Sequence, residues 1–128
     1  MQPITAEWVA KAEGDWTTAH LAYRSRKTPD YDAACFHAQQ CAEKHLKALI
    51  QEAGIPVPRT QDLVALLAIA VTMEPSWSWL DPDLRALGVY AVTVRYTSTF
   101  ATRTDARDAI RISRIVRGLI REALGLPT

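Results

Sequence analysis

The sequence predicts an all-α protein in which four long helices plus one short helix form an up-and-down bundle. Apolar residues recur three and four positions apart in five segments, which is the period of an amphipathic helix. Glycine, proline and capping residues separate these segments. No segment alternates with period two for long enough to form a strand, and the best candidate, residues 89–96, continues the helical pattern before it. These observations place the chain among helical bundles.

The first expected helix runs from a capping Thr5 to about Ser25. Gly14 lies inside this segment and lowers helix stability by about 1 kcal/mol relative to alanine, which does not end a helix of this length. The residues expected near its inner face are Trp8, Val9, Ala12, Trp16, Ala19 and Tyr23.

The second expected helix opens at Asp30 or Asp32, either of which can cap it. It ends at Gly54, because two prolines follow within the next four residues. On a projection of about 100° per residue, one stripe of this helix forms a core face. The members of the stripe are Cys35, Ala38, Ala42, Leu46, Leu49 and Ala53.

The edge of the second helix opposite this core stripe carries polar residues separated by small ones. His37, Gln40 and Lys44 lie on this edge, together with Cys41 and Ala48. A solvated face normally carries long charged side chains, whereas alanine or cysteine lets a neighbouring backbone approach closely. The edge is therefore either simply exposed or a second interface, which would be a dimer contact or a ligand-binding surface.

Three further helices complete the expected bundle, at residues 62–74, 83–97 and 104–125. The connection between the first two of these is expected to be a loop that packs down through Trp77, Trp79 and Leu80. The residues expected to be mostly buried in the bundle are Trp8, Trp16, Leu46, Leu49, Leu66, Leu87, Val116 and Leu119.

The length and composition are those of one globular domain, which we expect to span residues 1–128. Hydrophobic residues make up 48% and charged residues 23% of the chain, as in ordinary globular proteins. The formal net charge of +1 gives no global reason to expect nucleic acid or an anionic membrane as a partner.

Cysteine usage predicts a cytoplasmic protein with reduced thiols and with neither a metal nor a cofactor. Cys35 and Cys41 are six positions apart on one expected helix, which is too far for a disulfide between them. The sequence shows no other cysteine, no Cys/His pattern with metal-ligand spacing and no signal peptide. The longest apolar run, residues 63–73, is too short to span a bilayer, so no membrane association is expected.

The fourth expected helix is apolar around most of its circumference, which predicts burial on more than one side. Arg95 lies on its apolar face, where an unpaired charge is untenable. Either Arg95 pairs with a carboxylate inside the bundle and the polar edge is only hydrated, or it contributes to an anion or nucleotide site. The groove expected in the second case contains His37, Gln40, Lys44, Arg95 and Tyr96.

The fifth expected helix carries a stripe of arginines at spacings of four and three residues. The stripe consists of Arg107, Arg111, Arg114, Arg117 and Arg121. It is either a solvated face partly neutralised by neighbouring carboxylates, or a surface that contacts RNA or DNA phosphates with salt-dependent affinity. No aromatic residue is interleaved with the arginines, which argues against base stacking.

Three stretches follow one another in an informative order: FHAQQCAEKHLKALIQEAG at residues 36–54, PRTQDLVALL at 58–67 and VRYT at 94–97. Together they resemble the HEPN (higher eukaryotes and prokaryotes nucleotide-binding) domain family. The resemblance extends over nearly the whole chain, beginning with an AxxDWxxA pattern at residues 12–19. It implies a small helical bundle that usually dimerises. It also implies a relation to proteins that are often encoded beside a minimal nucleotidyltransferase in toxin–antitoxin-like pairs, many of which are ribonucleases.

The ribonucleases of that family carry an arginine followed, after four to six residues, by a histidine. These residues pair across the dimer and cleave RNA without metal. None of His20, His37 and His45 has an arginine at that distance before it. Neither Arg95 nor Arg103 is followed by a histidine at that distance. The usual proton carrier of the ribonuclease reaction is therefore missing from its usual place.

Two classes of function follow. The missing motif favours a non-catalytic HEPN-like domain, expected as a homodimer, which binds a nucleotidyltransferase partner or a nucleotide-like ligand in a toxin–antitoxin-like context. The alternative is a metal-independent endoribonuclease toxin with a non-standard site around Arg95 and His37, the candidate catalytic residues. Gln61 and Thr97 also stand where the family usually has histidine and proline. An RNA-cleavage assay separates the two classes.

Overall fold

The computed structural model describes residues 1–96 and 99–128, with side chains described for residues 1–90 and 99–128. Within that part of the chain the structure consists of helices and connections, without strands. The helices are α1 (Pro3–Arg24), α2 (Tyr31–Glu52), α3 (Leu63–Met73), the 3₁₀ helix η1 (Pro75–Leu80), α4 (Asp81–Tyr96) and α5 (Arg103–Ala123). The predicted fold class is confirmed: α1, α2, α4 and α5 are the long helices and α3 is the short one.

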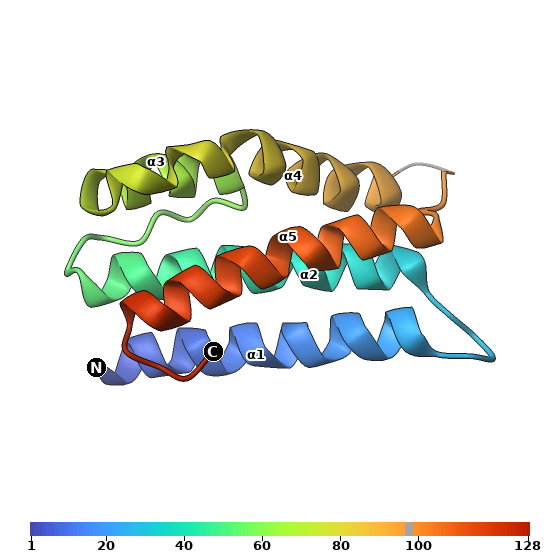
Figure 1. Cartoon of the computed structure of the whole chain (residues 1–128), viewed down its shortest axis with the longest axis horizontal. Coiled ribbons are helices and arrows are strands. Elements are labelled where there is room, and N and C mark those ends of the chain that lie inside the picture. The colour runs from blue at the N-terminus through green and yellow to red at the C-terminus, as the bar shows by residue number, and fades with distance from the viewer. Residues whose placement is uncertain (97–98) are drawn as a thin grey trace.

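Helix α2 is the centre of the bundle. In Figure 1, α3 and α4 form one layer, α1 forms the opposite layer, and α2 and α5 run between them. Helix α2 packs against each of the other four α-helices. Its predicted core stripe is therefore buried, except for the capping residue Ala53, and so are Cys41 and Ala48 on the edge opposite the stripe. The small residues on that edge let neighbouring helices approach, as their size predicted.

The N-terminal helix begins earlier than expected. Pro3 occupies the first helical position, where its fixed φ favours helix initiation, and Gln2 is the N-cap. Thr5 is not the cap: its hydroxyl is buried and donates to Glu52 Oε1 at 2.9 Å. A tertiary hydrogen bond to the end of α2 thus replaces the expected local one.

Aspartate side chains cap two helices, at the predicted Asp30 and at Asp62. Asp30 caps α2 by accepting a hydrogen bond from the backbone N–H of Ala33 at 2.9 Å. Asp62 caps α3 by accepting one from Val64 N at 3.0 Å. The fifth helix starts one residue earlier than expected, because Thr102 and Asp105 form a reciprocal capping box.

The connection between α3 and α4 is helical and not a loop. A 3₁₀ helix has about three residues per turn, so Trp77 and Leu80 share one side. Both side chains are buried, whereas Trp79 is 55% exposed. The expectation that Trp79 packs down was therefore wrong. Helix α4 also begins two residues before the expected Asp83.

The residues predicted for the core are buried to different degrees. Leu46, Leu49, Leu66, Leu87 and Val116 are buried. By contrast, Trp8, Trp16 and Leu119 are half-buried. Cationic side chains lie over the rings of both tryptophans, and Trp16 also packs against the hydrophobic core. Within the described residues, no helix combines the length and apolar character needed to cross a membrane.

Candidate functional site

The polar edge of α2 faces α1 of the same molecule. Asp15 of α1 is only 8% exposed. Its carboxylate accepts hydrogen bonds from His37 Nδ1 at 2.7 Å and from Lys44 Nζ at 2.6 Å. Two of the predicted edge residues therefore converge on one carboxylate. Sequence reasoning overlooked Asp15 as a polar partner, although it belongs to the AxxDWxxA pattern.

This contact fixes the His37 ring. An ionised carboxylate can only accept, so Nδ1 of His37 carries the proton and, in the neutral ring, Nε2 is an acceptor. The His37 side chain is 29% exposed, against 10% for Asp15. A carboxylate that orients a partly exposed imidazole in this way is the arrangement found behind general bases.

Gln40 belongs to a different network. Its Nε2 donates to Gln39 Oε1 at 2.7 Å and to Glu43 Oε1 at 3.3 Å. Glu43 also accepts from Lys47 Nζ at 3.0 Å, and both of these charged residues are buried. Lys47 in turn lies 5.5 Å from the centre of the Trp8 ring. The predicted edge is thus divided between two sets of partners.

The other two members of the predicted groove, Arg95 and Tyr96, have side chains that lie outside the described residues. A groove shared by these side chains with His37, Gln40 and Lys44 stays a prediction.

The C-terminal part of the arginine stripe is neutralised within the molecule. Arg117 donates to both oxygens of Glu13 at 2.8 Å, a bidentate pair between α5 and α1. Arg121 Nη1 lies 3.5 Å from the same carboxylate. Burial alone would raise the pKa of Glu13, but the hydrogen bond and charge of Arg117 hold it below its ordinary value. These two arginines have structural partners.

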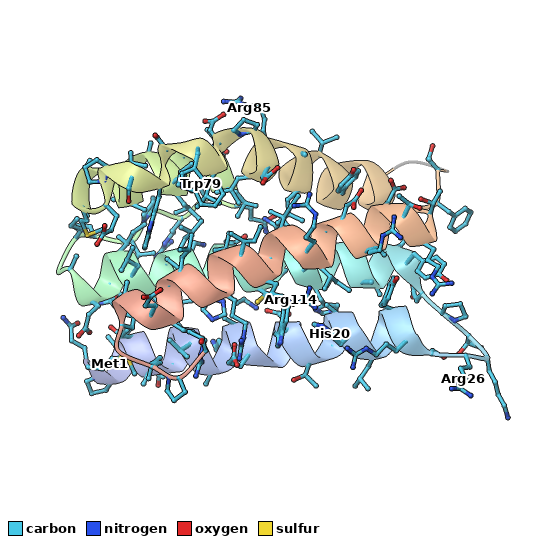
Figure 2. The ribbon with its side chains drawn as sticks, in the orientation of Figure 1. Met1, His20, Arg26, Trp79, Arg85 and Arg114 are labelled. Atoms are coloured by element: carbon cyan, nitrogen blue, oxygen red, sulfur yellow. The ribbon has the colours of Figure 1, made fainter. Side chains whose placement is uncertain are left out.

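The remaining arginines of the stripe line a cavity of about 230 Å³ between α1 and α5, which we call the arginine cavity. Figure 2 shows His20 of α1 and Arg114 of α5, which lie on its two sides. In the described part of the chain, none of its four arginines forms a salt bridge. The residues that line it are His20, Tyr23, Arg24, Arg107, Ile110, Arg111 and Arg114.

Trp16 holds two side chains beside the arginine cavity. The guanidinium of Arg114 lies 5.5 Å from the centre of its ring, within the range of a cation–π contact. The His20 ring packs edge-on against the same indole, with ring centres 4.2 Å apart. His20 Nδ1 also lies 2.9 Å from the Trp16 carbonyl, to which it donates. Sequence reasoning found the α5 arginines by their spacing and overlooked the α1 side of this cavity.

A buried histidine adjoins the neutralised arginines. His45 is fully buried, and its Nδ1 donates to the Cys41 carbonyl at 2.9 Å. Its Nε2 lies 3.4 Å from Glu13 Oε2. Burial lowers the pKa of His45 to about 4, so the ring is neutral at pH 7. Its burial keeps it from reaching a ligand in solvent.

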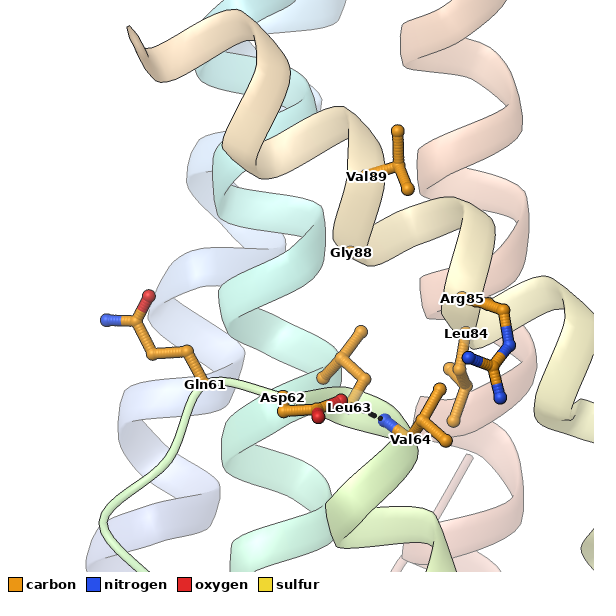
Figure 3. A pocket seen from close by; sticks show the side chains of 8 residues that line it. All are labelled: Gln61, Asp62, Leu63, Val64, Leu84, Arg85, Gly88 and Val89. Atoms are coloured by element: carbon orange, nitrogen blue, oxygen red, sulfur yellow. Dashed lines mark hydrogen bonds between the residues drawn. The ribbon is translucent and has the colours of Figure 1, made fainter.

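A second cavity, of about 480 Å³, lies where the start of α3 meets α4 (Figure 3). Leu63, Val64, Leu84 and Val89 give it a mainly apolar lining. Asp62 lines it too, but its carboxylate is engaged in capping α3 (Figure 3). Arg85 is the one cation among its described lining residues, and it is paired with Asp81. Among the described residues, no group of three or more His, Cys, Asp or Glu side chains is placed to hold a metal ion.

The fold defines a helical-bundle domain whose polar side chains gather between α1, α2 and α5. The family model described as HEPN domain matches residues 5–123, and the chain belongs to the HEPN domain family. The resemblance seen in the sequence is thereby confirmed.

Two solved structures are similar to the chain. TT1696 from Thermus thermophilus superposes with a TM-score of 0.81 and 22% identity over 94% of this chain and 98% of that one. ST0689, an archaeal HEPN homologue, superposes with a TM-score of 0.73 and 25% identity over 96% of this chain and 98% of that one. No curated protein matches the chain. At 22% identity, the likeness to TT1696 shows the fold alone.

Proposed function

We propose that the chain is a non-catalytic HEPN module that forms a homodimer and binds a nucleotide-like ligand or a minimal nucleotidyltransferase partner. Membership of the HEPN family supports the module. The absence of the Arg-x4–6-His motif from the sequence supports a role without catalysis.

The observation that carries ligand binding is the contrast between the two halves of the arginine stripe. Arg117 and Arg121 share Glu13, whereas the other three arginines of the stripe surround the arginine cavity, whose described lining contains no carboxylate. Cations that converge without a counter-charge repel one another, and an anion between them relieves the repulsion. Arginine binds phosphate oxygens in a bidentate manner, so a nucleotide-like ligand fits this chemistry.

Calorimetric titration of the purified protein with a nucleoside monophosphate at two salt concentrations tests ligand binding. We expect binding at low salt and a clear loss of affinity at high salt, because screening weakens contacts between exposed charges and phosphate. Absence of binding at low salt would remove the nucleotide from the proposal. Light scattering at the same protein concentrations tests the homodimer, with a monomer as the contrary result.

The partner can be tested separately with a purified minimal nucleotidyltransferase. We expect the two proteins to elute as one complex in gel filtration at low salt. Separate elution at every concentration used would contradict the nucleotidyltransferase partner and leave the nucleotide-like ligand as the proposed binding function.

One observation favours the alternative, a metal-independent endoribonuclease. The Asp15 carboxylate orients the partly exposed His37 ring through Nδ1, which leaves Nε2 as the acceptor nitrogen of the neutral ring. His37 has the geometry of a proton acceptor, but its expected partner Arg95 has a side chain outside the described residues. The missing Arg-x4–6-His motif makes the non-catalytic function the main proposal.

A further inference from the structure

The arginine cavity is small and has cations on two sides. Arg24 approaches from α1, and Arg107, Arg111 and Arg114 approach from α5. At about 230 Å³ it lies below the range of about 300–1,000 Å³ typical of pockets that enclose a whole small molecule. It has room for one charged group of a ligand, while the rest of that ligand stays outside.

The number of cations without a salt bridge indicates the charge of this group. A phosphomonoester carries a charge of about −1.5 to −2 at pH 7 and three terminal oxygens. A phosphodiester carries a single charge on two such oxygens. The monoester therefore offers one more terminal oxygen and more negative charge than the diester to guanidinium groups on both α1 and α5.

The walls of the arginine cavity hold its side chains in defined positions. Ile110 is 5% exposed and forms an apolar part of the lining. Trp16 positions Arg114 through its ring and His20 through its carbonyl.

The two acidic residues of α1 nearest to this region in sequence, Glu13 and Asp15, are engaged elsewhere. Arg117 occupies both oxygens of Glu13. The two oxygens of Asp15 accept from His37 and Lys44. Neither carboxylate is therefore free to neutralise the cations of the arginine cavity.

We infer that the arginine cavity is a subsite for a terminal phosphate, the phosphomonoester group of a nucleotide or of a nucleic-acid end. This inference rests on the proposed function and specifies its ligand class. The base and sugar of such a ligand lie outside the cavity, so the phosphate supplies most of the recognition and the identity of the base contributes little.

Calorimetry at low salt with four small probes tests the charge requirement. The probes are adenosine 5′-monophosphate, adenosine 3′,5′-cyclic monophosphate, adenosine and inorganic phosphate. We expect the monoester to bind about tenfold more tightly than the cyclic diester, which corresponds to one charge-assisted hydrogen bond. Adenosine should not bind, and inorganic phosphate should compete with the monoester. Equal affinity for monoester and diester would overturn the inference and leave the proposed function intact.

Matched variants test the location. Arg111→Ala should weaken binding of the monoester about tenfold or more. Arg85→Ala removes the same charge from α4, where Arg85 is paired with Asp81, and should leave binding unchanged. Circular dichroism confirms that both variants are folded. Binding that survives Arg111→Ala, or is lost equally in Arg85→Ala, contradicts a site in this cavity. Binding of none of the probes by the wild type would overturn the inference and the nucleotide part of the proposed function together.

Short RNA strands with a 5′-phosphate or a 5′-hydroxyl distinguish the source of the group. Tighter binding of the phosphorylated strand, again sensitive to Arg111→Ala, identifies a strand end as a source. Equal binding of both strands, combined with tight binding of the free nucleotide, identifies the free nucleotide as the source. Tighter binding of the strand that ends in a hydroxyl would contradict recognition of a terminal phosphate.

Discussion

Oδ1 of Asp15 lies 2.7 Å from His37 Nδ1, joining α1 to the polar edge of α2. The second carboxylate oxygen of Asp15 accepts from Lys44 Nζ at 2.6 Å. One nearly buried carboxylate thus holds two side chains that are a little under two helical turns apart. The arrangement links α1 to α2 through Nδ1 of His37 and Nζ of Lys44.

Replacing Asp15 by alanine should destabilise the fold. The substitution leaves Lys44 without its partner and His37 without its acceptor in a half-buried position. Removing one partner of a buried charged hydrogen bond costs about 1–3 kcal/mol, and we expect a loss within that range. Urea unfolding measured by circular dichroism gives the free energy of unfolding.

The control for this prediction is Asp81→Ala. Asp81 pairs with Arg85 on the surface of α4, with side-chain exposures of 42% and 65%. Exposed pairs four residues apart contribute only about 0.3–0.5 kcal/mol. A loss at Asp15 no larger than that at Asp81 would show that the Asp15 contacts do not stabilise the bundle.

Stability should fall as the pH is lowered through the titration of His45. Its pKa is about 4 in the folded protein and about 6.5 in an unfolded chain. Between these values the unfolded chain binds a proton that the folded protein does not, so acid favours unfolding. The stabilisation is fully present above pH 6.5, and about 3 kcal/mol of it is lost by pH 4.

Urea titrations at pH 7 and pH 5 test the role of His45 while the carboxylates stay largely ionised. His45→Gln removes the titrating ring and should reduce the loss of stability between the two pH values by about 2 kcal/mol. If the variant shows the same pH dependence as the wild type, His45 is not the group responsible.

Leu46 should contribute strongly to the core. It is fully buried on the central helix, and truncation of such a residue leaves a cavity beside its neighbours. Leu46→Ala is expected to lower the free energy of unfolding by about 2–5 kcal/mol. Leu21→Ala is the matched control, because Leu21 is 68% exposed and its truncation should change stability very little. Similar losses in both variants would contradict the core position of Leu46.

Purified protein should not cleave single-stranded or structured RNA above background. The sequence lacks the arginine–histidine spacing of the catalytic members, in which the histidine carries the proton. Gel analysis of labelled RNA after incubation measures this. Cleavage that disappears in a folded His37→Ala variant would instead establish the ribonuclease alternative.

Much of the fold could be predicted from local sequence. Asp30 and Asp62 cap α2 and α3 because a short acidic side chain reaches backbone N–H groups within the first turn. Gly54 follows the end of α2 with a positive φ of 75°, a conformation that glycine adopts readily. These effects act over a few residues, so the sequence reveals them directly. The 3₁₀ helix that exposes Trp79 was harder to predict from the sequence, because its aromatic residues resemble those of a packed loop.

The candidate site depended on tertiary structure. The sequence by itself determined that the α5 arginines share one face, since their spacing follows the helical period. Only the packing of α1 against α2 and α5 decided which of them have partners. Glu13 neutralises Arg117 from 104 positions away, while Arg24 joins the cations of the arginine cavity from the C-terminal end of α1. The pairing of charges depends on which helix faces meet, and helical periodicity specifies each face without specifying its neighbour.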